Sequence, residues 1–163
     1  MFDTFFGLPL HPLVVHATEV LVPLAAAFVV LTAAWPRFRR WSGYLTLGLA
    51  LVALALVPIS KESGEQLEAR VEENALIETH AELADGLLPW VIGLVVVAGA
   101  LLWWNLREKR ANASAASGND AKTGPRWIPI TLLVLALVAA GGTTVQAVLI
   151  GHSGAAAVWS GEV

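Results

Sequence analysis

The sequence predicts an all-α integral membrane protein, a four-helix bundle formed by the whole chain of 163 residues as a single membrane domain. Hydrophobic residues make up 56% of the chain and charged residues only 14%, whereas a soluble domain carries about 25% charge. The apolar residues fall into four runs, each near the roughly 20 residues that a helix needs to cross a bilayer. We expect transmembrane helices at about residues 13–34, 42–59, 83–104 and 128–150.

Basic residues predict how these helices are oriented. Eight of the ten lie in two alternate connections: Arg37, Arg39, Arg40, Arg107, Lys109, Arg110, Lys122 and Arg126. The positive-inside rule assigns both connections to the cytoplasm, and the acidic loop 60–79 to the outer side. We therefore expect an up-down-up-down bundle with both termini outside and the linker 105–126 inside. Five tryptophans fit an aromatic belt at the inner boundary: Trp35, Trp41, Trp103, Trp104 and Trp127.

Two polar segments complete the expected organisation. Ser63 followed by Gln66 fits a capping box, which predicts a short acidic surface helix over about residues 63–77. The polar, low-complexity segment 111–125 is typical of a disordered linker.

Composition limits the possible chemistry. The chain has no cysteine, and its one methionine is Met1, so disulfides, thiolate metal sites, cysteine-held iron–sulfur clusters and c-type haem are excluded. Glycine-rich phosphate loops and nucleic-acid signatures are absent from the sequence. Any bound metal or haem must therefore use nitrogen or oxygen ligands.

All four histidines are expected on the outer side, from three different helices. His11 and His16 lie at the start of the first helix, His80 at the start of the third and His152 at the end of the fourth. Ionisable groups in membrane spans are costly and usually mark a functional site, so this convergence predicts one. His11 can also be interpreted as a solvated cap residue, and His80 and His152, taken singly, as structural residues.

Carboxylates accompany the histidines. His16 and Glu19 share a helix face, so Glu19 could orient the His16 ring or carry its proton. Glu82, Asp85 and Pro89 repeat the spacing of His16, Glu19 and Pro23, which suggests a duplicated hairpin. The alternative is that Glu82 and Asp85 only stabilise the positive end of a helix dipole.

The fourth helix carries two further patterns. Gly141, Val145, Val148 and His152 form one stripe, in which Gly141 would leave space for a flat ligand or for helix packing. The segment GHSGA (151–155) looks like a serine-hydrolase elbow, but it ends a membrane helix instead of joining a strand to a helix. A nucleophilic role for Ser153 is therefore not expected.

Three segments carry a family resemblance: LHPLVVHATEVLVPLA (10–25), LIETHAELAD (76–85) and GHSGAAAVW (151–159). They resemble a bacterial family of four-helix membrane proteins, domain of unknown function 2231, with its HPxxVH opening, a histidine before the third helix and a GHxGAxxV-like ending. The resemblance implies that His11, His16, His80 and His152 are the family's histidines. It also implies a multi-pass protein of the inner membrane of a bacterial cell. It further implies a redox setting, because such domains can occur beside Rieske-type or cytochrome domains. The sequence departs from the family at Ala17-Thr18, where Phe-Pro is frequent, and at Trp159, where tyrosine is common.

Three functions remain open. The first is a b-type haem held by two of His16, His80 and His152, preferably His16 and His80, for one-electron transfer within a respiratory or other redox membrane complex. The second is a zinc, copper or non-haem iron site made of these three histidines and Glu19, with His11, Glu82 and Asp85 around it. The third is a cofactor-free accessory subunit. An electron-transfer or accessory role is favoured over a stand-alone enzyme.

Overall fold

The computed structural model describes residues 4–5, 8–69, 75–116, 125 and 127–159. Five helices dominate: α1 (Leu10–Ala34), α2 (Pro36–Glu68), α3 (Ala75–Asp85), α4 (Leu87–Ala116) and α5 (Trp127–Trp159). Two short strands, β1 (Thr4–Phe5) and β2 (Leu8–Pro9), pair antiparallel before α1.

Four helical segments are long and apolar enough to cross a membrane, which confirms the prediction of an all-α protein with four such helices. Large apolar side chains are exposed along these helical segments, for example Val20, Val96 and Val138. Soluble monomers rarely leave so much contiguous apolar surface in water. These faces are suited to contact with lipid.

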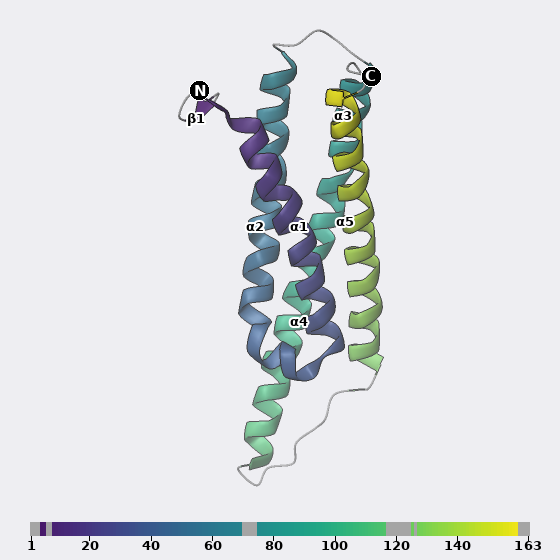
Figure 1. The fold of residues 1–163 in the computed structure, drawn as a ribbon. Coiled ribbons are helices and arrows are strands. Elements are labelled where there is room, and N and C mark those ends of the chain that lie inside the picture. The colour runs from purple at the N-terminus through teal and green to yellow at the C-terminus, as the bar shows by residue number, and fades with distance from the viewer. Residues whose placement is uncertain (1–3, 6–7, 70–74, 117–124, 126, 160–163) are drawn as a thin grey trace.

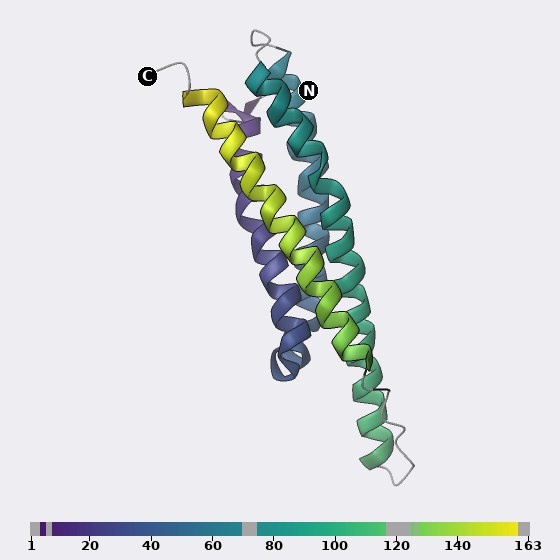
Figure 2. The ribbon, with the colours of Figure 1, turned by 90° about the vertical axis from the view of Figure 1, so that its right-hand side faces the viewer.

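The long helices form a ring in which α1 packs on α2 and α5, α4 packs on α2 and α5 as well, and α1 and α4 make smaller contacts with each other. In Figure 1 successive long helices run in opposite directions, and α1 begins at the same end of the bundle at which α5 ends. We call this the histidine end. We call the opposite end, where Trp35 joins α1 to α2, the tryptophan end. Figure 2 shows α4 projecting beyond the other helices at the tryptophan end.

Helix bounds differ from the sequence-based expectation outside the apolar runs. Residues 63–68 continue α2, and α3 begins at Ala75, so the expected acidic helix over 63–77 is not a separate element. Residues 70–74 of that segment lie outside the described part. Ser63 donates to the carbonyl of Ser60 within α2 (2.8 Å) and does not begin a new helix. Residues 105–116 continue α4, and most of the rest of the expected linker lies outside the described residues.

Buried hydroxyl groups join α1 to α2 near the tryptophan end. Thr32 Oγ1 lies 2.8 Å from Thr46 Oγ1 and 3.2 Å from Ser42 Oγ, and all three side chains are fully buried. Hydrogen bonds of this kind hold membrane helices together where the hydrophobic effect cannot.

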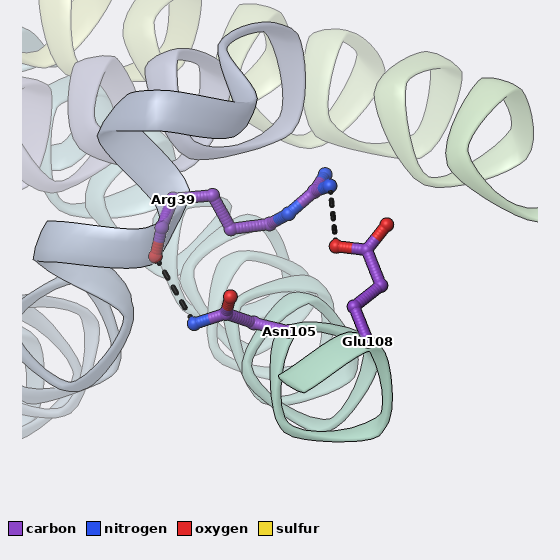
Figure 3. A network of polar contacts seen from close by, with 3 residues as sticks. All are labelled: Arg39, Asn105 and Glu108. Carbon is purple, nitrogen blue, oxygen red and sulfur yellow. Dashed lines mark hydrogen bonds and ion pairs between the residues drawn. The ribbon is translucent and has the colours of Figure 1, made fainter. Parts of the chain in front are cut away.

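A polar network fastens α2 to α4 at the tryptophan end (Figure 3). The buried Arg39 guanidinium donates to Glu108 Oε2 (2.8 Å), and Asn105 Nδ2 donates to the carbonyl of Arg39 (3.1 Å). Trp104 is also buried, so it belongs to the core and not to the expected aromatic belt, whereas Trp35, Trp41, Trp103 and Trp127 are exposed.

The third membrane-crossing segment is interrupted at Gly86, between α3 and α4. Gln146 of α5 fills this position: its Nε2 donates to the carbonyl of Leu83 (2.6 Å) and lies 2.7 Å from where a Cβ of Gly86 would be. One turn further, the Trp90 ring packs directly on the backbone of Gly142, where an added Cβ would come within 2.2 Å of the ring. Gly142, and not the exposed Gly141, therefore provides the close helix packing.

Candidate functional site: a cavity between two histidines

A cavity of about 570 Å³ opens at the histidine end, among all five helices. Its inner wall is apolar and includes Val22 of α1, Val57 of α2 and Leu87 of α4, which belong to one buried core cluster. This volume falls within the range of roughly 300–1,000 Å³ that is usual for small-molecule and cofactor sites. The cavity is the candidate site.

Two histidines line this cavity. His11 comes from the first turn of α1 and His80 from the middle of α3. Each ring is held by a serine from a different helix: His11 Nδ1 lies 3.0 Å from Ser63 Oγ of α2, and His80 Nδ1 lies 2.9 Å from Ser153 Oγ of α5. The site thus depends on residues that are far apart in the sequence.

The serines determine which nitrogen of each ring carries the proton. Ser63 donates its only hydrogen to the carbonyl of Ser60 (2.8 Å), and Ser153 donates its own to the carbonyl of Ile150 (2.9 Å). Each serine oxygen can then only accept from the histidine, so Nδ1 is the protonated nitrogen of the neutral ring. Nε2 of His11 and of His80 keeps its lone pair, which can bind a metal or accept a hydrogen bond.

This geometry also excludes a serine nucleophile at Ser153. In a Ser–His pair for nucleophilic catalysis, the imidazole accepts the serine proton. Here the ring donates and the serine proton goes to a backbone carbonyl. The likeness of GHSGA to a hydrolase elbow therefore has no counterpart in the chemistry of the site.

The charged residues around the cavity are mostly acidic. Glu19, Glu65, Glu68 and Asp85 contribute to its lining, and among the described residues Lys61 is the one Lys or Arg that does. Lys61 pairs with Asp85 across α2 and α3 (2.6 Å) and with Glu65 one turn along α2 (3.8 Å). Both pairs are about half exposed, so they add little to stability.

The other expected site residues lie elsewhere. His16 is exposed, outside the cavity lining, and its Nδ1 bonds to the carbonyl of Pro12 and not to Glu19. His152 is exposed on α5, and Glu82 is exposed on α3; neither lines the cavity. Among the described residues, no three His, Asp or Glu side chains are placed to hold a metal ion together.

Sequence reasoning missed the two serines and interpreted His11 as a cap residue. The available signal was the dipeptide Ser-Gly, present at 63–64 and 153–154. A Cβ at Gly64 would lie 3.0 Å from His11 Cε1, and one at Gly154 would lie 3.1 Å from His80 Cε1, so glycine admits each ring. The same dipeptide occurs at 42–43, 117–118 and 160–161, so it could not single out the site by itself.

Comparison with known proteins agrees with the four apolar helices. Neither the curated proteins nor the solved structures gave a match. A family model described as "Predicted membrane protein (DUF2231)" matches residues 7–163, which include every helix and both histidine–serine pairs. The chain therefore belongs to the DUF2231 family of membrane proteins, as the sequence resemblance indicated.

Proposed function

We propose that this protein binds b-type haem in the cavity at the histidine end and carries single electrons, and that His11 and His80 are the residues that would hold the iron. The observation that supports this most directly is the state of the two rings. Both are tied through Nδ1 to a serine and leave Nε2 free, as ligating histidines usually do. His80 was among the ligands expected from the sequence, whereas His11 replaces His16 because only His11 lines the cavity.

The rest of the site suits such a cofactor. The chain offers no cysteine and no internal methionine, so histidine is the available axial ligand. Haem iron would supply the one-electron change. The chain's own residues would hold the iron through two imidazoles and exclude water with the apolar inner wall.

Orientation forms part of the proposal. We place the bundle up-down-up-down with the histidine end outside, on the strength of the basic connections, and in the inner membrane of a bacterial cell, as the family resemblance implies. The cavity would then face an electron carrier or a redox complex on the outer side of the membrane.

The test is the optical spectrum of the purified protein, prepared with haem supplied during expression. A Soret band with one haem per chain is expected, and His11→Ala or His80→Ala should each lose at least about tenfold in haem content, as loss of a ligand or its support does. His16→Ala and His152→Ala, which change exposed histidines outside the cavity, are the matched controls and should keep full occupancy.

Other outcomes identify the competing functions. A stoichiometric zinc, copper or iron ion without porphyrin would support a metal site, including the expected set of His16, Glu19, His80 and His152. A preparation without haem or metal that still assembles with a membrane complex after all four histidines are replaced would support an accessory subunit.

The carboxylates that line the cavity favour a second candidate ligand, an uncharged quinol. These are Glu19, Glu65, Glu68 and Asp85. Four carboxylates around the cavity disfavour the anionic propionates of haem, whereas a quinol has no charge and two hydroxyl donors for the two Nε2 atoms. Quinone extracted by solvent from a haem-free preparation, and lost in His11→Ala, would support this ligand.

A further inference from the structure

The two histidine–serine pairs are built in the same way, one joining α1 to α2 and the other joining α3 to α5. His11 bonds to Ser63, and His80 bonds to Ser153. Each serine also donates to the carbonyl three residues earlier in its own helix. Each is followed by a glycine against which the histidine ring lies. Because α1 and α4 each pack on both α2 and α5, the pairs occupy equivalent places in the ring of helices.

The pattern of buried residues in α1, counted from His11, recurs in α4 when it is counted from His80. At 7, 11, 14, 18 and 21 residues after His11, α1 buries Thr18, Val22, Ala25, Val29 and Thr32. At the same five distances after His80, α4 buries Leu87, Val91, Leu94, Ala98 and Leu101. Among the described residues, α1 also buries Ala26 and Ala33, which correspond to the half-buried Val95 and Leu102. α4 also buries Val97, which corresponds to the half-buried Phe28, and Trp104 and Asn105, which correspond to the exposed Trp35 and Pro36 beyond the end of α1.

The serines fix a second register, between α2 and α5. At 10, 13, 17 and 21 residues before Ser63, α2 buries Ala53, Ala50, Thr46 and Ser42. At the same distances before Ser153, α5 buries Thr143, Ala140, Ala136 and Leu132. The fifth buried residue of α5, Ala139, corresponds to the half-buried Leu49.

The sequence analysis paired α1 with α3 and α4 in a different register, shifted by three residues from the one that His11 and His80 define. Pairing His16, Glu19 and Pro23 with Glu82, Asp85 and Pro89 would set the fully buried Val22 against the exposed Leu88. The register defined by His11 and His80 pairs Val22 with the buried Val91, and its buried-against-exposed pairs lie only beyond the end of α1, at Trp35 and Pro36.

We infer that the chain is two equivalent helical hairpins, and that Ser63 and Ser153 are equivalent positioning residues that hold His11 and His80 with Nδ1 protonated and Nε2 directed to one shared ligand. Both imidazoles then present the same atom in the same protonation state. The role of these rings as ligands rests on the function proposed above, whereas their tautomer does not.

The test is nitrogen NMR of the ligand-free full chain, labelled with ¹⁵N-histidine, at a pH where the rings are neutral. Nδ1 and Nε2 have distinct shifts according to which carries the proton. In the wild type, His11 and His80 should both show protonated Nδ1. Ser63→Ala should move only the His11 ring toward a mixture of tautomers, and Ser153→Ala should do the same only to His80.

The controls separate positioning from general folding. Ser114→Ala removes another serine that bonds a carbonyl of its own helix, and it should change neither ring. Ser63→Thr keeps the hydroxyl and should restore the His11 tautomer. Protonated Nε2 in the wild-type rings, or a Ser63→Ala spectrum identical to the wild type, would overturn the inference. If the protein binds no haem but its rings show the expected tautomers, the proposed function is wrong and the role of the two serines stands.

Discussion

At the scale of single residues, Glu19 is an exposed carboxylate of α1 at the edge of the cavity. It contributes to the lining, and its Oε1 lies 3.1 Å from where a Cβ of Gly151 would be, against the backbone of α5. A negative charge near an iron centre stabilises its oxidised form, because that form carries one more positive charge.

We therefore expect Glu19→Gln to raise the midpoint potential of bound haem by roughly tens of mV, the effect of about 1 kcal/mol of charge interaction on a one-electron couple. Potentiometric titration followed by optical spectroscopy measures this shift. Glu82→Gln removes an exposed carboxylate outside the cavity and is the matched control. Equal shifts in the two variants, or none in Glu19→Gln, would contradict a role for Glu19 at the cofactor.

The sequence could not show which of two histidines, His11 or His16, lines the cavity. The two residues are five positions apart on α1 and therefore point to different sides of the helix. In a soluble helix the apolar stripe would tell which side faces the core. In a membrane helix both the lipid-facing and the inward-facing sides are apolar, so α1 gives no such signal.

At the scale of helices, Gly142 controls the distance between α4 and α5. Trp90 lies directly on its backbone, so a methyl group there cannot be accommodated without moving the two helices apart. We expect Gly142→Ala to lower the free energy of unfolding by about 1–3 kcal/mol, the usual cost of overpacking.

Gly141→Ala is the control, because an added Cβ there would meet nothing within 4 Å. It should be neutral or stabilising by up to about 1 kcal/mol, since alanine favours the helix over glycine. Reversible unfolding in mixed detergent micelles measures both changes, and equal effects would show that Trp90 does not set the packing.

Helix number could be predicted from the sequence, whereas helix length could not. Each crossing segment needs an apolar run of a certain length, and all four runs were found. The polar residues after Ile59 and Trp104 mark where apolar contact ends, but Lys61, Glu62, Glu65 and Lys109 also favour helix, so α2 and α4 continue past it. Backbone hydrogen bonding, and not hydropathy, determines where these helices end.

At the scale of the whole molecule, orientation is open to a direct measurement. The chain has no natural cysteine, so single cysteines can be introduced without background labelling. We expect Ala69→Cys, at the histidine end, to react with a membrane-impermeant maleimide in intact cells. Ala121→Cys, in the connection between α4 and α5, should react only after the membrane is opened. The reverse pattern would invert the proposed orientation and place the cavity on the cytoplasmic side.

The interruption at Gly86 makes the two halves of the site unequal in how they connect to the rest of the bundle. His11 is part of a continuous helix of 25 residues, about 37 Å long, that reaches the turn at Trp35. His80 lies on the separate α3 of 11 residues, which joins α4 at Gly86, bonds to α5 through Gln146 and Ser153, and bonds to α2 through the Lys61–Asp85 pair. The position of His11 is therefore set by one helix that runs through the bundle, whereas the position of His80 depends on side-chain bonds from two neighbouring helices.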